Sequence, residues 1–338
     1  MVLYDNNPPL VIAEAGVNHN GSLDIAFAMV DAAASAGADY IKFQTFKTEN
    51  LVTPSAFSAT YQAKNCNASS QLEMLRSLEL SEEDFIKIKK HCKLKNIGFL
   101  STPFDLESLL FLKKLGMDFI KVPSGEITDL PFLRAIAETR TPVIVSTGMS
   151  EVSEISDALK VFENKGYGKS DIILLHCNTQ YPTPYEDVNL RAMISLRETF
   201  GYLTGYSDHT NGIEVPVAAT ALGAMVIEKH FTLNREMNGP DHAASLSPDE
   251  LRQMVKSIKN TFIALGSSQK RVSLSESENI PAARKSIVAA RNISKGEVLT
   301  ADNLTCKRPG TGLSPMLWDD VIGSVAVKDY EKNDLIEF

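Results

Sequence analysis

Residues 202–231 read YLTGYSDHTNGIEVPVAATALGAMVIEKHF, and this stretch contains one complete repeat of the expected fold. Short runs rich in apolar, β-branched and aromatic residues at 202–208 and 225–231 predict two strands. The segment between them is long enough for one helix and its two loops. This strand–helix–strand order predicts that the two strands lie parallel in the same sheet.

The same alternation extends back to the beginning of the chain. Eight strands alternating with helices predict a (β/α)8 TIM barrel. A doubly wound α/β sheet is the alternative, but no GxGxxG motif follows the first strand. The last helix, 248–265, is the clearest, because a capping box at Ser247–Glu250 starts it and Gly266 ends it. The six further strands are predicted at 10–16, 40–45, 98–103, 119–124, 143–148 and 172–177.

Composition divides the chain into three parts. Residues 1–266 are expected to form the catalytic barrel, and the polar, serine-rich segment 267–283 a linker. Residues 284–338 are expected to form a small domain that has little core of its own and docks on a barrel. Within the long connection 46–97, the polar stretch SAFSATYQAKNCNASS (55–70) is typical of a functional loop or lid.

Bulk properties exclude several classes of protein. The 338 residues carry a net charge of −8, which argues against a nucleic-acid partner. No run approaches the ~18 apolar residues of a membrane span, and the first residues do not resemble a signal peptide. The four cysteines form no CxxC pair. These features predict a cytoplasmic protein with free thiols and no membrane partner.

Each predicted strand carries polar side chains at or near its carboxyl end, where TIM barrels perform their chemistry. Their number favours an enzyme over a non-catalytic carbohydrate-binding or structural protein, which does not need such a ring. A Schiff-base aldolase is also disfavoured, since the sixth strand, 172–177, has no lysine. These polar residues include Glu14, Lys42, Gln44, Thr102, Lys121, Ser124, Glu126, Ser146, His176, Asn178, Asp208, His209, Glu228 and His230.

Two lysines lie inside apolar runs, Lys42 in YIKFQT and Lys121 in FIKVPS. A buried ammonium group needs an anion beside it. One interpretation is a salt bridge to Glu14 or Glu228. The other is that both lysines face an anionic substrate, in a phosphate or carboxylate site completed by hydroxyl groups and backbone N–H groups.

Two histidines, His209 and His230, end consecutive predicted strands. Each could simply hydrogen-bond at a strand end. As a pair on neighbouring strands ~4.8 Å apart, both rings could bind one metal ion and leave positions open for water or substrate. Glu228 lies on the same strand face as His230 and is a candidate third ligand or a partner that orients the first two.

The chain resembles the sialic acid synthase family along nearly its whole length. The matching blocks are IAEAGVNHNGS, KFQTFK, FLSTPFD, KVPSGE, VSTGMS, LLHCNTQYPTPYEDVNL, GYSDHTNG, EKHFT, GPDHAASL and KRPGTGLSP. The resemblance implies an enzyme that joins phosphoenolpyruvate to an N-acylated mannosamine-type sugar, giving a nine-carbon 2-keto acid and phosphate. It also implies a barrel followed by a small antifreeze-like (SAF) domain, which crosses over in a domain-swapped homodimer to complete the partner's site.

The resemblance further implies a role for each matching residue. A divalent ion, manganese in the first place and magnesium or cobalt as alternatives, would be bound by His209 and His230 and polarise the sugar's aldehyde. The catalytic carboxylate would be Glu126, with Glu14 as second choice. The residues implied in phosphoenolpyruvate binding are Lys42, Thr102, Lys121, Ser124, Ser146 and either Asn178 or Thr179, because Thr179 replaces an asparagine of some members. Those implied in sugar binding are Glu14, Gln44, Glu126, Tyr181, Asp241 and Arg308.

Two acceptor sugars are compatible with the resemblance. N-acetylmannosamine, which gives N-acetylneuraminate, is expected first. The alternative is 2,4-diacetamido-2,4,6-trideoxymannose, which gives legionaminic acid by the same reaction.

Overall fold

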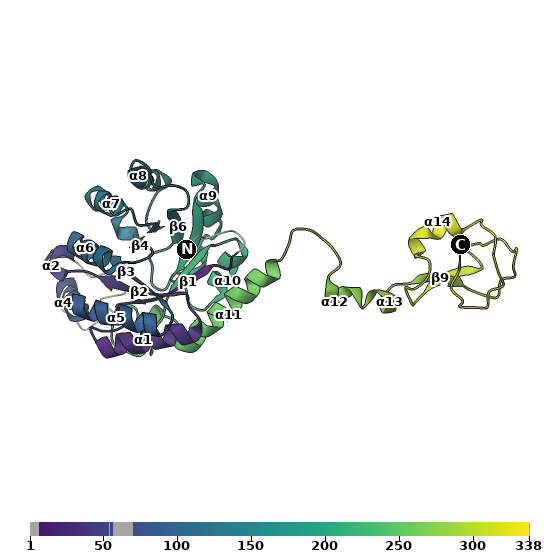
Figure 1. Ribbon diagram of the computed structural model, residues 1–338, viewed down its shortest axis with the longest axis horizontal. Helices are drawn as coiled ribbons and strands as arrows, with labels where there is room; N and C mark the ends of the chain where they lie inside the picture. The colour runs from purple at the N-terminus through teal and green to yellow at the C-terminus, as the bar shows by residue number, and fades with distance from the viewer. Residues whose placement is uncertain (1–6, 54, 57–69, 338) are drawn as a thin grey trace. The chain divides into compact units, whose positions relative to one another are not determined.

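Eight parallel strands form the sheet of the first of two compact units, residues 1–266, in the computed structural model (Figure 1). The structure describes residues 7–53, 55–56 and 70–337. The strands are β1 (Leu10–Gly16), β2 (Tyr40–Thr45), β3 (Gly98–Pro103), β4 (Ile120–Val122), β5 (Val143–Ser146), β6 (Ile172–Cys177), β7 (Leu203–Asp208) and β8 (Val226–His230).

Strand order confirms the predicted TIM barrel. The sheet runs β3-β2-β1-β8-β7-β6-β5-β4, so the first strand pairs with the last, and β3 and β4 contact each other at the seam. A doubly wound sheet does not bring the first and last strands together in this way. The prediction was too long for β4, which ends at Val122 because Pro123 has no N–H to donate to the ladder and a 3-10 turn, Ser124–Glu126, follows.

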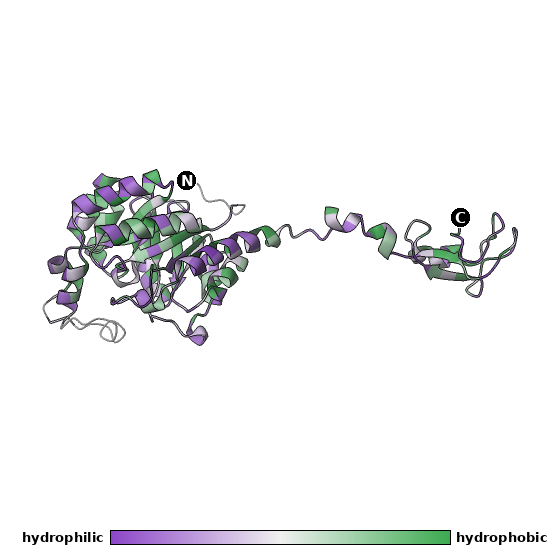
Figure 2. Cartoon of the chain, turned by 90° about the horizontal axis from the view of Figure 1, so that it is seen from below, coloured by the Kyte–Doolittle hydropathy of each residue, from purple (hydrophilic) through white to green (hydrophobic). Residues whose placement is uncertain are grey.

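Helices cover the outside of the barrel, with their apolar faces toward the strands (Figure 2). Two short helices precede α5 in the long connection after β2, and most of its predicted loop, residues 57–69, lies outside the described residues. The helices are α1 (Leu23–Ala36), α2 (Thr48–Leu51), α4 (Gln71–Leu78), α5 (Glu82–Leu94), α6 (Leu106–Leu115), α7 (Leu130–Ala137), α8 (Val152–Glu163), α9 (Arg191–Phe200), α10 (Glu214–Ala221) and α11 (Pro248–Leu265).

The capping box predicted for α11 is present. The Ser247 side chain accepts the N–H of Glu250, and the Glu250 side chain accepts the N–H of Ser247. Residues of its apolar stripe from Leu251 to Ile258 are buried, whereas Leu265 at its end is half exposed.

Side chains inside the barrel form two layers. Alternate residues of a strand point to the same face, so positions two apart along each strand share the lumen. Apolar side chains fill the half nearer the amino ends of the strands, including Ile12, Leu100, Ile144, Ile173 and Val226. The next inward position along these strands is polar on β1, β3, β5 and β8, which places a buried polar layer directly above an apolar floor.

The second unit, residues 267–338, has a core of its own, contrary to the expectation that it has little. Its strands β9 (Ser286–Ala289) and β10 (Leu304–Lys307) pair antiparallel, and Ile287, Leu304 and Tyr330 are buried beside them. Short helices α12 (Leu274–Ser277) and α13 (Ile280–Ala283) occur in the predicted linker, and a capping box formed by Ser273 and Glu276 starts the first of them. A further short helix, α14 (Trp318–Val321), completes the unit.

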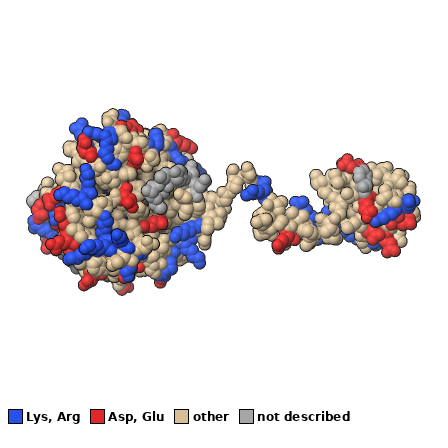
Figure 3. Space-filling view, in the orientation of Figure 1, with Lys and Arg blue, Asp and Glu red and all other residues tan. Residues whose placement is uncertain are grey.

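The surface of the first unit carries both charge signs. Figure 3 shows Lys and Arg interspersed with Asp and Glu over its visible face. Within the described ranges, no helix has the length and apolar character needed to cross a membrane.

Candidate active site

A cavity of about 330 Å³ opens at the carboxyl ends of the strands of the first unit. The barrel gathers there residues that lie far apart in the sequence. Every candidate site residue predicted from the sequence lines this cavity, except Asn178 and Arg308. These lining residues are Glu14, Lys42, Gln44, Thr102, Lys121, Ser124, Glu126, Ser146, Thr179, Tyr181, His209, His230 and Asp241.

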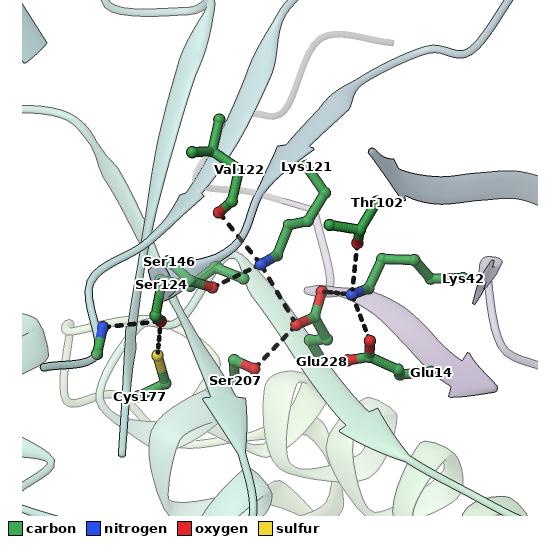
Figure 4. Close-up of polar contacts among 12 residues, drawn as sticks. Glu14, Lys42, Thr102, Lys121, Val122, Ser124, Ser146, Cys177, Ser207 and Glu228 are labelled. Carbon is green, nitrogen blue, oxygen red and sulfur yellow. Dashed lines mark hydrogen bonds and ion pairs between the residues drawn. The ribbon is translucent and has the colours of Figure 1, made fainter. Parts of the chain in front are cut away.

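Two lysines and two glutamates form an ion-pair network at the bottom of the cavity. Lys42 Nζ donates to Glu14 Oε1 at 2.7 Å and to Thr102 Oγ1 at 3.2 Å, and lies 3.3 Å from Glu228 Oε2 (Figure 4). Glu228 also lies 3.7 Å from Lys121 Nζ. The salt-bridge interpretation of the lysines is confirmed, because both have a carboxylate partner. Both also line the cavity, and binding of an anionic substrate there stays a prediction.

The two lysines differ in how far neighbouring carboxylates compensate their positive charge. Burial alone would lower the pKa of Lys42, but Glu14 and Glu228 outweigh it and raise this pKa above its ordinary value. Burial does lower the pKa of Lys121, because Glu228 offsets it only in part. Lys121 is therefore the ammonium group with more capacity left for a bound anion.

One serine hydroxyl contacts Lys121, and a second serine lines the same cavity. Lys121 Nζ donates to Ser146 Oγ at 2.6 Å. Ser124 Oγ accepts the N–H of Gly148 at 3.0 Å and lies 3.3 Å from Cys177 Sγ, as Figure 4 shows. An ammonium group with two serine hydroxyls on one side of a cavity matches the predicted phosphate or carboxylate site.

The two candidate catalytic carboxylates lie in different environments. Glu14 is buried, but the charges of His230, Lys42 and Lys121 overcome the effect of burial and lower its pKa. Glu126, in the 3-10 turn after β4, is partly buried, and burial together with Asp129 raises its pKa. A raised pKa brings Glu126 closer to the range in which a carboxylate exchanges protons near neutrality.

The two histidines lie close together at the mouth. Their ring centroids are 5.6 Å apart, and the tilted ring of Tyr181 has its centroid 4.0 Å from that of His209. Burial and the neighbouring His230 lower the pKa of His209 to about 3, so its ring is neutral at pH 7. His209 Nδ1 pairs with the backbone oxygen of Asn178 at 2.5 Å, which leaves Nε2 as the atom with a lone pair.

These side chains fit a divalent metal through two ring nitrogens. His230 Nδ1 is buried without a hydrogen-bond partner, and His209 is held neutral, as metal ligation requires. No set of three His, Cys, Asp or Glu side chains among the described residues is arranged to bind a metal. Glu228 as a third ligand is therefore not supported. It lies two residues before His230 along β8, where it pairs with the lysines and Ser207.

Two predicted site residues lie outside the cavity. Asn178 uses its side-chain oxygen to accept the N–H of Gln180 at 2.8 Å, while the adjacent Thr179 lines the cavity. Arg308 is an exposed residue of the second unit, and its Nε donates to the Ala283 oxygen at 3.0 Å.

One side of the cavity is an apolar wall that was not predicted from the sequence. It consists of Leu51 and Val52 at the end of α2 and of Met74, Leu75 and Leu78 on α4. Met74 and Leu78 pack on Val17 and Phe46. The spacing of 74, 75 and 78 marks one helix face, but nothing in the sequence indicated that this face borders the barrel mouth.

Comparisons with known proteins agree with this geometry. The NeuB family matches residues 29–270, and the SAF domain matches residues 284–338. The N,N'-diacetyllegionaminic acid synthase of Campylobacter jejuni is 49% identical over 328 residues, covering 97% of this chain and 98% of that protein. The enzyme of the same name from Legionella pneumophila is 44% identical over 317 residues, covering 93% of this chain and 89% of its own.

A solved structure supports the same family and fold. The N-acetylneuraminic acid (sialic acid) synthetase of Leptospira borgpetersenii is 37% identical and superposes with a TM-score of 0.72, covering 81% of this chain and 91% of that one. The expected fold and family are thus confirmed. The chain belongs to the NeuB family, with a SAF domain as its C-terminal unit.

Proposed function

We propose that this protein condenses phosphoenolpyruvate with an N-acylated mannosamine-type sugar, releasing a nine-carbon 2-keto acid and inorganic phosphate. The supporting observation is that one cavity holds a buried lysine with serine hydroxyls on one side and a pair of imidazoles on the other. Lys121, Ser124 and Ser146 supply the first, and His209 with His230 the second. The relatives named above, synthases of legionaminic or sialic acid, support the same reaction class.

Lys121 and the two serines bind the phosphate or carboxylate of phosphoenolpyruvate. Lys42 and Thr102 complete this side of the site, with Thr179 favoured over Asn178 because Thr179 lines the cavity. His209 and His230 would hold a divalent ion, manganese in the first place, which when bound would supply Lewis-acid polarisation of the sugar's aldehyde. Gln44, Tyr181 and Asp241 line the remaining polar wall and orient the sugar.

The double bond of phosphoenolpyruvate supplies the electron pair that joins carbon three to the aldehyde carbon, and the aldehyde oxygen takes up a proton and becomes a hydroxyl. A water molecule adds to the cationic carbon two and gives one proton to Glu126, which balances the proton taken up by the aldehyde oxygen. The hydroxyl left on carbon two loses its proton as the bond from carbon two to the phosphate oxygen breaks, which forms the keto group and releases inorganic phosphate. The raised pKa of Glu126 favours it over Glu14, whose lowered pKa and contact with Lys42 make it a weak base.

The acceptor we propose is 2,4-diacetamido-2,4,6-trideoxymannose, the alternative of the sequence analysis. The two relatives named as N,N'-diacetyllegionaminic acid synthases support it. So does the apolar wall, because this sugar has a second acetamido methyl and a methyl at carbon six where N-acetylmannosamine has hydroxyls. N-acetylmannosamine remains the second candidate, supported by the name of the Leptospira protein.

Phosphate release tests the reaction directly. The purified protein is supplied with phosphoenolpyruvate, Mn²⁺ and each sugar in turn, and inorganic phosphate and the 2-keto acid are measured. We expect the greatest kcat/KM with the diacetamido sugar. Failure to release phosphate with any sugar of this class would reject the proposed reaction.

Replacing Leu75 by serine tests the apolar wall. We expect kcat/KM for the diacetamido sugar to fall by about tenfold while that for N-acetylmannosamine changes little, because one lost apolar contact changes discrimination by that order. Leu72→Ser is the matched control, since Leu72 lies on the same helix but does not line the cavity. Equal losses for both sugars in Leu75→Ser would contradict a selective wall.

Replacing Arg308 by alanine tests the proposed crossover of the SAF domain in a homodimer. We expect KM for the sugar to rise roughly thirtyfold, as when a charge-assisted hydrogen bond is lost, with unchanged thermal unfolding. Lys307→Ala, at the exposed neighbouring position, is the control. Because each site would use the arginine of the other protomer, mixed dimers of Arg308→Ala with Glu126→Gln should regain activity, and mixtures that stay inactive would count against crossover.

A further inference from the structure

A buried ion pair lies directly beside the two histidines along the chain. Asp208 precedes His209 at the end of β7, and Lys229 precedes His230 in β8. The two charged residues are register partners across the β7–β8 ladder. Their exposed fractions are 0% and 1%. Neither lines the cavity, because successive strand residues point to opposite faces of the barrel wall.

Lys229 connects the residues on either side of His209. Its ammonium group pairs with Asp208 Oδ2 and donates to the backbone oxygen of Thr210 at 2.7 Å. Asp208 in turn accepts the N–H of Thr210 at 3.1 Å and its hydroxyl at 3.0 Å. Asp208, Thr210 and Lys229 therefore form a closed set of contacts around the backbone of His209.

The ring of His209 packs beside the Tyr181 ring, with centroids 4.0 Å apart, and two hydrogen bonds hold the residue to the same loop as that tyrosine. Its Nδ1 pairs with the Asn178 oxygen, and its backbone oxygen accepts the N–H of Thr183 at 2.9 Å. Both contacts come from the loop after β6. Lys229 links His209 to β8. Its contacts with Asp208 and Thr210 hold the residues on both sides of His209 to the strand that carries His230.

Stability alone does not account for this pair. Removing two charges from water is costly, and well-packed apolar residues of similar size serve the stability of a fold as well or better. What an ion pair adds is direction, since its atoms must meet at defined distances and angles. That property matters where two strands must present ligands in a fixed relation.

We infer that the Asp208–Lys229 pair positions the ligands for metal binding. It fixes the backbone of His209 relative to His230 so that both rings can bind one ion. The inference rests on the metal role given to these histidines in the proposed function. Neither Asp208 nor Lys229 touches substrate, so both are positioning residues.

Mn²⁺ binding to the full-length protein without substrates tests the inference. Free Mn²⁺ is measured by electron paramagnetic resonance for the wild type, Asp208→Asn, Lys229→Met and the double variant. The double variant leaves no unpaired buried charge and retains an oxygen for the Thr210 N–H, so we expect it to unfold at the wild-type temperature. We expect it to bind Mn²⁺ about tenfold to a hundredfold more weakly, as when residues that orient metal ligands are lost.

Two further measurements separate positioning from a general loss of structure. KM for phosphoenolpyruvate should stay unchanged in the double variant, since Lys121 and its serines lie on other strands, while the Mn²⁺ concentration for half-maximal activity rises. Tyr40→Phe is the control, because it removes a polar contact of 2.7 Å to Asp118 at the opposite end of the barrel. It should bind Mn²⁺ like the wild type.

The outcomes distinguish this inference from the proposed function. If the wild type binds Mn²⁺ and the folded double variant binds it equally well, the positioning role is rejected and the proposed reaction is unaffected. If the wild type takes up no Mn²⁺, the metal role fails and the inference fails with it. If none of the three variants folds, the pair is required for folding and the positioning role is likewise rejected.

Discussion

Lys121→Met is expected to lower kcat/KM for phosphoenolpyruvate by about a thousandfold, because losing one partner of a buried charge contact costs several kcal/mol. Lys121 Nζ lies 3.7 Å from the carboxylate of Glu228 and donates to the hydroxyl of Ser146. The loss should appear mainly as a higher KM for phosphoenolpyruvate and weaker inhibition by inorganic phosphate. Steady-state kinetics at saturating sugar measure both.

The control for Lys121→Met is Lys160→Met, which removes an exposed lysine of α8 paired with Asp157. It should leave both constants unchanged. A Lys121→Met protein that folds normally and keeps KM within a factor of about three would place the anion site elsewhere.

The same lysine predicts a pH dependence. An anion is bound by the charged ammonium group, which is lost as pH rises through its pKa. Since burial holds the pKa of Lys121 below the ordinary 10.5, phosphoenolpyruvate affinity should weaken at a lower pH than for an exposed lysine. The measurement is the fall of kcat/KM for phosphoenolpyruvate at alkaline pH. This fall should be absent in Lys121→Met.

Glu126→Gln is expected to reduce kcat by about a hundredfold to ten-thousandfold, the usual contribution of a general base. Glutamine keeps the size of the side chain, so binding of both reactants should change little. A base acts when deprotonated, and activity therefore falls as pH falls through its pKa. Because burial and Asp129 raise the pKa of Glu126, the acid limb of kcat should lie above the ordinary value of 4.5.

Asp129→Asn is a second test of Glu126 as the general base, because it changes the pKa of that carboxyl. Asp129 caps α7 by accepting the N–H of Phe132, a bond that asparagine can also make. The substitution therefore removes a charge without removing the cap, and the acid limb should move to lower pH. Glu126→Gln with near wild-type kcat would transfer the base role to another group, with Glu14 next.

Strand positions and the inward residues were predictable because both follow from simple periodicities. The alternation of strands with helices gave the barrel, and period two along each strand separated inward from outward side chains. His176 shows where the list of polar strand ends was too inclusive. It lies between the inward-facing Leu175 and Cys177, so it points to the helices, where its Nε2 pairs with the Val188 oxygen at 2.9 Å.

Pairing across strands was not predictable, since it depends on register. Whether Lys42 would meet a substrate or a carboxylate could not be decided until β1, β2 and β8 were placed side by side. The register sets Glu14 opposite both Lys42 and His230. Lys229 was overlooked for the same reason, although a lysine between Glu228 and His230 in an apolar run was a visible signal. The apolar wall depended on where α4 lies, which local sequence does not determine.

The apolar floor beneath the charged layer has a kinetic consequence. Ile12, Leu100, Ile144 and Val226 are almost completely buried and close the lumen below Lys42 and Lys121 among the residues described. Reactants and products therefore share one entrance. A molecule seated against Lys121 must arrive before, and depart after, any molecule seated nearer that entrance. Binding and release should therefore follow a compulsory order, which product-inhibition patterns in steady-state kinetics would reveal.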